Sequence, residues 1–237
     1  MKVSIMQPYF FPYLGYFQLI KNADRFILFD DVQYIRHGWI NRNRTLKPVE
    51  GWQYIVAPIQ KHKRDDLIKD IQLKPGEEWK QKIFRQLEHY KKKAPYYEQT
   101  LELLNSCFQS NESNVTRFNA NCLNVICQHL EIPFEVEISS EMNFDYSDVN
   151  DAGEWALRIS EQLNASEYVN PSGGAELFSV EKFRNANIQL SFLNSELLPY
   201  SQKRDVFEAG LSILDVILFN GLENTKAMLD SYNIERL

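Results

Sequence analysis

The chain has 237 residues, which is enough to bury a substantial core in one large domain or two small ones. Hydrophobic residues make up 44% and charged residues 24%, a composition typical of globular proteins, and the net charge of −6 argues against a general nucleic-acid-binding protein. No apolar run approaches the roughly 20 residues that span a bilayer, and the first residues lack a signal-peptide pattern. A cytoplasmic protein without a membrane span is therefore expected.

Short apolar runs separated by a helix-length segment begin the chain. Residues 2–5, 25–29 and 52–57 are predicted to be strands, and residues 13–21 are predicted to form a helix between the first two. This alternation is typical of βαβ units and a parallel sheet.

The middle of the chain is predicted to be mostly helical. Apolar residues recur at helical spacing over 77–92, Pro95 is expected to begin a further helix, and residues 114–130 are expected to form another. A strand is predicted around residues 134–138. The segment near residues 76–130 is therefore interpreted as a helical insertion.

Helices and strands alternate again in the last third. Asp151 and Glu154 fit an acidic variant of the capping box, which predicts a helix over residues 152–163. The further predicted elements are a strand at 168–169, a helix near 179–187, a strand at 188–193, and helices at 211–220 and 224–232. Since no repeat or linker divides the chain, we expect one α/β domain over residues 1–237, with a Rossmann-like, mostly parallel sheet.

Chemistry-bearing side chains follow the predicted strands, where open α/β sheets bind their ligands. An aromatic loop, MQPYFFPYLGYF at residues 6–17, follows the first strand, and Asp30 and Asp31 follow the second. These carboxylates are interpreted as a metal or ribose site, or as salt partners of nearby arginines. Because adjacent side chains alternate faces on a strand, only one of the two is expected to reach a shared site.

Residues 33–44 combine rings and amides with cationic side chains. Arginines near strand ends can hold a phosphate or carboxylate through paired N–H donors, although charge runs are usually solvated loops. The cationic or potentially cationic residues are Arg36, His37, Arg42 and Arg44.

A further candidate is the turn NPSGG at residues 170–174. Its glycine pair would let main-chain N–H groups approach a ligand closely, but the same pattern also makes ordinary turns. Ser212 and Asp215 lie one turn apart in an apolar helix, and they need partners if they are buried. The three cysteines lack metal-ligand spacing, so they are not predicted to hold a metal ion.

The segments MQPYFFPYLGYF, ADRFILFDDVQY, GWINRNR, NPSGGAELF and LSILDVILFNG occur in this order. They resemble the successive motifs of the WbqC-like family, bacterial proteins from gene clusters for O-antigen and other surface polysaccharides. The resemblance runs from about residue 3 to about residue 221. It implies a transferase that moves a glycyl or other acyl group to an amino sugar.

The loop from Pro12 to Tyr16 is also similar in layout to the Pro-x-x-Gly-His loop of nucleotidyltransferases and pantothenate synthetase. In those proteins histidines bind nucleotide phosphates as charge builds on them. Tyr13 and Tyr16 stand where the histidines would be. A tyrosine hydroxyl donates a hydrogen bond but carries no positive charge, so this departure counts against adenylyl transfer.

Three functions follow as hypotheses: amide formation on an amino sugar, nucleotidyl transfer or ATP-dependent ligation, and noncatalytic binding or scaffolding. ATP with Mg²⁺, or a nucleotide or nucleotide-sugar substrate, is the small molecule considered. The candidate catalytic residues are Asp30, Asp31 and His37. The candidate substrate-binding residues are Gln7, Tyr9, Tyr13, Tyr16, Arg36, Trp39, Asn41, Arg42, Arg44, Ser172, Gly173 and Gly174.

Overall fold

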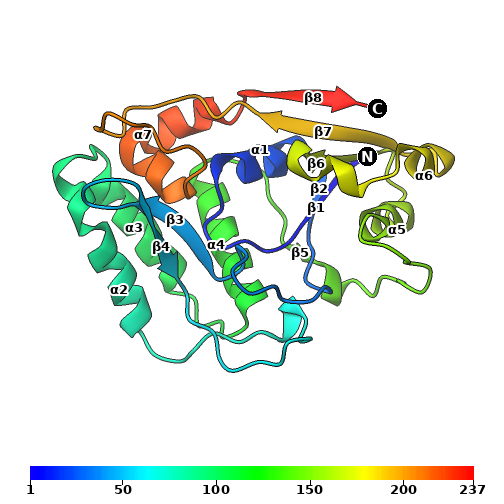
Figure 1. The fold of residues 1–237 in the computed structure, drawn as a ribbon, viewed down its shortest axis with the longest axis horizontal. Helices are drawn as coiled ribbons and strands as arrows, with labels where there is room; N and C mark the ends of the chain where they lie inside the picture. Colours follow the sequence, from blue (N-terminus) through cyan, green and yellow to red (C-terminus); the bar gives the residue numbers. More distant parts are fainter.

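A six-stranded sheet forms the centre of the computed structural model, which describes residues 1–237 (Figure 1). The strand order is β5-β2-β1-β6-β7-β8, and all neighbours are parallel except β7 and β8. The strands are β1 (Lys2–Met6), β2 (Arg25–Leu28), β5 (Glu137–Ile138), β6 (Glu167–Pro171), β7 (Gln189–Ser195) and β8 (Tyr232–Arg236). The chain thus runs outward from β1 in one direction and from β6 in the other, as in a Rossmann-like α/β fold. The predicted fold class is confirmed.

Helices cover both faces of this sheet. Side chains in and just after β2 alternate between two cores: Phe26 and Leu28 pack into the larger one, whereas Ile27 and Phe29 pack into the smaller one. In Figure 1, α5 and α6 lie on one side of the sheet and α2 to α4 on the other. The helices are α1 (Leu14–Asn22), α2 (Glu78–Leu87), α3 (Tyr97–Phe108), α4 (Val115–His129), α5 (Glu154–Gln162), α6 (Val180–Asn185) and α7 (Ile213–Met228). The helical insertion near residues 76–130 is therefore present as α2, α3 and α4.

The run at residues 52–57 forms a strand, as predicted, but this strand does not join the parallel sheet that the alternation of the first elements suggested. It forms β4 (Trp52–Val56), which pairs antiparallel with β3 (Arg42–Leu46) in a separate hairpin. A parallel strand needs a crossover of about a dozen residues or more, whereas only residues 47–51 join these two strands. The apolar residues of this segment indicated a strand, but they did not indicate that the strand pairs with β3.

The end of the chain also differs from the prediction. The two predicted helices are one element, α7, with a kink at Gly221, where φ is +71°. Residues 232–236 form β8 instead of ending a helix, because Tyr232 and Ile234 alternate with exposed residues and the strand pairs with β7.

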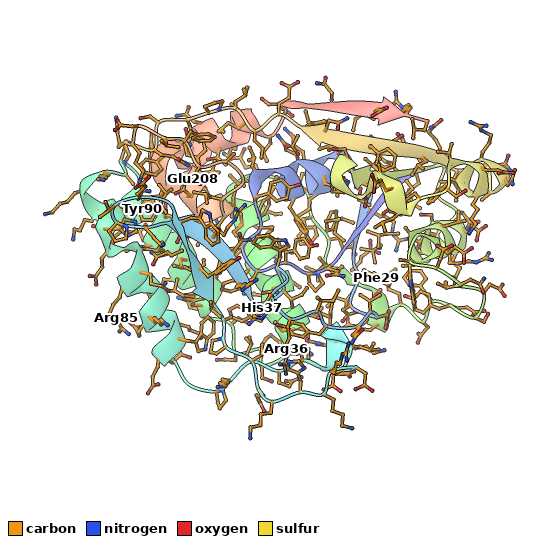
Figure 2. The ribbon with its side chains drawn as sticks, in the orientation of Figure 1. Phe29, Arg36, His37, Arg85, Tyr90 and Glu208 are labelled. Atoms are coloured by element: carbon orange, nitrogen blue, oxygen red, sulfur yellow. The ribbon has the colours of Figure 1, made fainter.

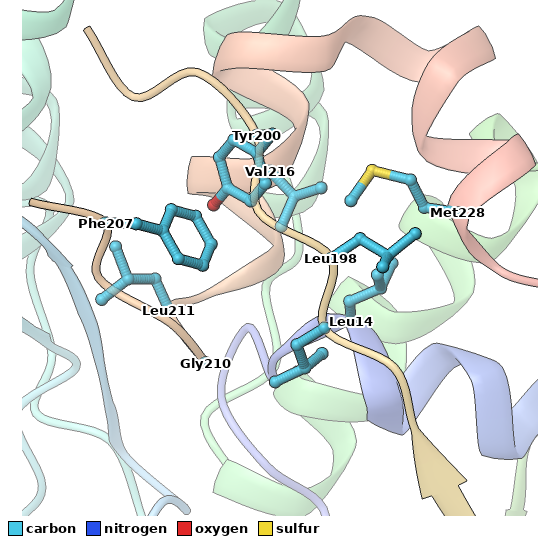
Figure 3. Close-up of a pocket in the computed structure, with 9 residues that line it drawn as sticks. Leu14, Leu198, Tyr200, Phe207, Gly210, Leu211, Val216 and Met228 are labelled. Atoms are coloured by element: carbon cyan, nitrogen blue, oxygen red, sulfur yellow. The ribbon is translucent and has the colours of Figure 1, made fainter. Parts of the chain in front are cut away.

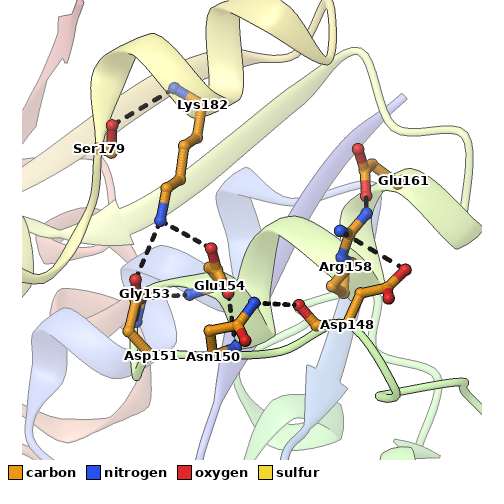
Figure 4. A network of polar contacts seen from close by, with 9 residues as sticks. All are labelled: Asp148, Asn150, Asp151, Gly153, Glu154, Arg158, Glu161, Ser179 and Lys182. Atoms are coloured by element: carbon orange, nitrogen blue, oxygen red, sulfur yellow. Dashed lines mark hydrogen bonds and ion pairs between the residues drawn. The ribbon is translucent and has the colours of Figure 1, made fainter.

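The start of α5 uses the predicted acidic residues in a shifted arrangement (Figure 4). Asp151 Oδ1 accepts hydrogen bonds from the backbone N–H groups of Gly153 and Glu154, at 2.9 and 3.2 Å. The Glu154 carboxylate accepts from the backbone of Asn150 rather than Asp151, at 2.6 Å, and also binds Lys182. Asp151 therefore satisfies the N–H of the first residue of α5, whereas Glu154 binds the turn before the helix, one residue earlier than a capping box places the reciprocal bond.

We predict that Gly221→Ala lowers the free energy of unfolding more than Gly51→Ala. Both glycines have positive φ, and strain of this kind costs about 1–2 kcal/mol for alanine. A Cβ at Gly221 would also lie 2.6 Å from the Tyr96 ring, which adds an overpacking cost of about 1–3 kcal/mol, whereas a Cβ at Gly51 meets nothing. Urea unfolding of both variants tests this, and equal losses would contradict it.

Candidate functional site

The aromatic loop after β1 has an irregular backbone held by two buried asparagines. Asn119 Nδ2 donates to the carbonyl oxygens of Pro8 and Ile40, both at 2.7 Å. Asn43 Nδ2 donates to the carbonyl of Phe10 at 3.0 Å. These bonds satisfy carbonyls that no helix or strand pairs, so the loop can lie inside the protein.

The rings of this loop divide into two groups. Phe10, Phe11 and Tyr16 are at most 1% exposed and belong to the core, and the Tyr16 hydroxyl donates to the carbonyl oxygen of Gln7 at 2.8 Å. Tyr9 and Tyr13 remain partly exposed. Burial raises the pKa of both phenols, so they are protonated hydrogen-bond donors at neutral pH.

Tyr9 and Tyr13 line a pocket of about 240 Å³, here called the aromatic pocket. It brings together four residues that the sequence predicted from two separate segments: Tyr9, Tyr13, Trp39 and Arg44. The other lining residues are Pro12, Asn43, Leu197 and Gly210. The pocket thus lies at the carboxyl end of β1, between the aromatic loop and the hairpin.

Arg44 is the cation of the aromatic pocket, and no carboxylate pairs with it. Its guanidinium carbon lies 5.4 Å from the centre of the Trp39 ring and 5.2 Å from that of Trp52. One terminal nitrogen donates to the carbonyl of Gly210 at 3.0 Å, while Nε is buried without a partner. Rings and backbone therefore hold a positive charge in place without neutralising it.

The other predicted cations lie outside this pocket. Arg42 stacks on Tyr54, 4.0 Å from the ring centre, and donates to the carbonyls of Gly38 and His37. Arg36 and His37 are exposed on the loop at the opposite end of the hairpin from Tyr90 (Figure 2). They do not line the aromatic pocket.

Asn41, Gln7 and the glycine turn also lie outside the aromatic pocket. Both polar ends of the Asn41 amide are occupied, by the Tyr34 hydroxyl at 2.8 Å and the carbonyl of Ala57 at 2.9 Å. Ser172, Gly173 and Gly174 begin the 3₁₀ turn η4 (Ser172–Leu177) after β6. A Cβ at Gly174 would lie 2.7 Å from Asn170 Nδ2, so this glycine packs closely against a side chain of β6, whereas a Cβ at Gly173 would meet nothing.

Asp30 and Asp31 follow the end of β2 and have separate partners. Asp30 is 1% exposed and accepts hydrogen bonds from the Ser139 hydroxyl and from the Ser140 backbone and hydroxyl, at 3.0 to 3.1 Å. Burial raises its pKa, and these bonds oppose that rise. Asp31 pairs with Lys69 at 2.9 Å and accepts from the Tyr146 hydroxyl at 3.0 Å. Neither carboxylate lines the aromatic pocket.

Residues 196–211, here called the strap, join β7 to α7 and close one side of the aromatic pocket with Leu197 and Gly210. Beneath the strap lies an apolar cavity of about 20 Å³, lined by residues such as Leu14, Phe207 and Val216 (Figure 3). This volume holds about one water molecule, so the strap packs closely on the core.

Asp215 anchors the strap from inside α7. Its carboxylate accepts from the hydroxyls of Tyr90 and Tyr200, both at 2.6 Å, and from Gln202 Nε2 at 3.2 Å. The expectation that a buried Asp215 needs partners is confirmed, although the sequence did not identify them. Tyr90 also accepts a hydrogen bond from the backbone N–H of Leu46, so Asp215 connects the strap with the hairpin.

Comparison with known proteins gives one family. The sequence model of the WbqC-like protein family matches residues 7–227. The chain belongs to the WbqC-like family. A protein of Mycobacterium tuberculosis (strain ATCC 25618 / H37Rv), named Uncharacterized protein Rv1507c, is 30% identical over 225 residues, which cover 94% of this chain and 95% of that protein.

No solved structure matches this WbqC-like protein. Among its described residues, no group of three or more His, Cys, Asp or Glu side chains is arranged to hold a metal ion. None of its helices is long and apolar enough to cross a membrane.

We predict that Asp215 makes the protein less stable as pH rises from about 4 to about 6. Burial raises the pKa of its carboxyl from 3.8 to about 6, so the folded state holds this proton at a pH where the unfolded state has lost it. Two pKa units correspond to about 3 kcal/mol. Asp215→Asn removes this titration.

Urea unfolding of wild type and Asp215→Asn at a series of pH values tests the prediction. Between about pH 4 and about pH 6, wild type should lose about 3 kcal/mol of unfolding free energy relative to Asp215→Asn. Parallel pH profiles would contradict the prediction. Asp30 also has a pKa raised by burial, but it is present in both proteins. Its contribution to the pH dependence therefore cancels when the two unfolding free energies are subtracted.

Proposed function

We propose that this WbqC-like protein is a transferase that forms an amide on the amino group of a nucleotide-linked amino sugar during synthesis of O-antigen or another surface polysaccharide. The observation that carries the proposal is the aromatic pocket, where aromatic rings lie beside Arg44 and no carboxylate pairs with it. Rings provide flat apolar surfaces for the C–H faces of a sugar, and an arginine supplies paired donors for a phosphate.

The size and surroundings of the pocket support this class of substrate. Pockets for drug-sized ligands measure about 300–1,000 Å³, so about 240 Å³ suits one sugar ring rather than a whole nucleotide sugar. Arg42 and Arg44 project from the same face of β3, and Trp52 and Tyr54 lie beside them with ring centres 4.9 Å apart. The sugar would lie in the pocket, and the nucleotide along this outer face of the hairpin.

In the proposed reaction the sugar amine attacks the carbonyl carbon of an activated acyl donor, such as a thioester. The new C–N bond forms, the bond from the acyl carbon to the leaving sulfur breaks, and the proton lost by the amine is taken up by the leaving thiolate or by water. The protonated phenols of Tyr9 and Tyr13 can donate to the acyl oxygen as negative charge develops on it.

Nucleotidyl transfer has less support, because it would need both tyrosines of the loop near phosphates. Tyr16 is fully buried and its hydroxyl is bound to the Gln7 carbonyl, so only Tyr13 faces a pocket. Noncatalytic binding makes a different prediction, namely that no small molecule binds in the aromatic pocket.

We predict that a nucleotide-linked amino sugar stabilises the protein and that Arg44→Ala weakens its binding about tenfold or more, because a hydrogen bond to a charged group contributes about 1.5–3 kcal/mol. At 100 times its dissociation constant the ligand should raise the unfolding free energy by about 2.7 kcal/mol, which shifts the melting temperature by a few degrees. Arg36→Ala is the matched control, because Arg36 is exposed and lies outside the pocket.

Mass spectrometry after incubation with acyl thioesters then tests for the amide product. Product formation that is lost in Arg44→Ala and kept in Arg36→Ala would support the proposal. Absence of binding by every nucleotide sugar, or equal losses in the two variants, would reject the aromatic pocket as the substrate site. Pyrophosphate release from Mg²⁺ and a nucleoside triphosphate would favour nucleotidyl or ligase chemistry instead.

A further inference from the structure

β8 is one edge of the six-stranded sheet, and it lies outermost along the top of the view in Figure 1. It pairs with β7 on one side, and no strand follows it on the other. All of its residues are half-buried or exposed. An edge strand leaves a row of backbone N–H and C=O groups to which another chain can bind.

The pairing with β7 determines which backbone groups of β8 face outward. The N–H of Leu237 donates to the carbonyl of Leu190, and the N–H of Glu196 donates to the carbonyl of Ser231, both at 3.0 Å. Both bonds fit the register of the two strands. Because bonded and non-bonded pairs alternate along an antiparallel ladder, the odd-numbered residues of β8 point their backbone groups toward β7. The even-numbered residues therefore point theirs away from the sheet.

These even-numbered residues are Tyr232, Ile234 and Arg236. The N–H of Tyr232 is bound to the carbonyl of Asp230 at 3.1 Å, so its own carbonyl is the group left for a partner. The ladder continues through every residue of β8 without a bulge, and the strand contains no proline. Bulges and prolines are two of the features that keep edge strands from pairing, so this edge is suited to accept a strand.

We propose that β8 pairs antiparallel with β8 of a second copy of this chain, about a two-fold axis at Ile234. Ile234 then faces itself and exchanges both of its free backbone bonds across the axis. The N–H of Arg236 donates to the carbonyl of Tyr232, and symmetry forms each bond twice. The proposal does not depend on the function proposed for the aromatic pocket, since no residue of β8 lines that pocket.

The side chains of β8 select this register. An axis at Ile234 pairs all five residues of the strand, with Tyr232 opposite Arg236 and Asn233 opposite Glu235. No like charges meet, and an arginine can lie over a tyrosine ring. An axis at Glu235 would place two carboxylates directly opposite each other, and an axis at Asn233 would pair only residues 232–234.

Charge and size set the strength expected of this contact. β8 carries one acid and one base, so two copies of the strand meet without net charge, although the whole chain has a net charge of −6. The ion pair of Arg236 with Glu167, at 3.5 Å, has an exposed arginine and contributes little, so Arg236 can turn toward the second copy. Stable interfaces bury about 1,200–2,000 Å², and one strand from each copy provides a small contact. We therefore expect a dimer that dissociates on dilution.

Sedimentation equilibrium of the whole chain, from micromolar to near-millimolar concentration, tests the proposal. The mass of the wild type should rise from that of one chain toward that of two. A mass that stays at one chain over the whole range would overturn the proposal.

Substitutions at the axis locate the contact. Ile234→Glu and Ile234→Lys each place like charges opposite each other, so each should weaken the dimer about tenfold or more. An equimolar mixture of the two variants should restore it, because glutamate then faces lysine. Val49→Glu is the matched control, since Val49 is 85% exposed in the turn between β3 and β4. An undiminished dimer in either single variant, or no recovery in the mixture, would overturn the assignment.

Amide hydrogen exchange of the wild type gives a second measurement that needs no variant. In the monomer the N–H groups of Ile234 and Arg236 face solvent, whereas those of Asn233 and Glu235 face β7. Raising the protein concentration should slow exchange at Ile234 and Arg236 more than at Asn233 and Glu235. A dimer that leaves exchange at Ile234 unchanged uses another surface, and this result would reject the β8 contact.

Discussion

The constraint on which the structure depends is the burial of an irregular backbone. Residues 7–13 follow β1 into the interior without forming a helix or strand, so their carbonyl groups need donors from elsewhere. Asn119 supplies them to Pro8 and, from the same amide, to Ile40. One side chain of α4 thus joins the aromatic loop to the segment that leads into the hairpin. The phenylalanines can then fill the core, while Tyr9 and Tyr13 turn toward a pocket.

The aromatic pocket follows from this attachment. The N–H of Phe10 donates to the carbonyl of Trp39 at 2.9 Å, which sets the hairpin beside the loop and brings Arg44 to it. The strap closes the remaining side because its carbonyl at Gly210 accepts from Arg44 and its Tyr200 binds Asp215. Segments from three parts of the chain therefore meet at a cation that rings hold in a fixed position. A site assembled in this way is ordered before any ligand arrives, which lowers the entropy cost of binding.

The sequence predicted the elements of this fold better than their partners. The apolar runs of β1, β2 and β7 indicated strands, and the spacing at 77–130 indicated helices, because both periods follow from local geometry. The hairpin was not predicted, because the alternation of side chains along β4 would be the same in the six-stranded sheet as in the two-stranded one. Tyr16 was placed in the site because the motif resembled a pair of phosphate-binding residues, yet it lies three residues after Tyr13 on a helix whose face is buried. The roles of Asn119 and Tyr200 depend on contacts across the chain, and no local pattern could predict them.

The separation of the carboxylates from the aromatic pocket also restricts the chemistry that the pocket can perform. Asp30 and Asp31 each have several hydrogen-bond partners, and neither lines the aromatic pocket. The titratable groups that do line it are two phenols with raised pKa values and an arginine, all of which are protonated at neutral pH and can donate hydrogen bonds. Such a set can stabilise negative charge on a phosphate or an acyl oxygen, but it offers no base. An amine that reacts there must therefore arrive neutral or release its proton to the leaving group or to water, and the pocket's contribution is to position the reactants and to stabilise charge.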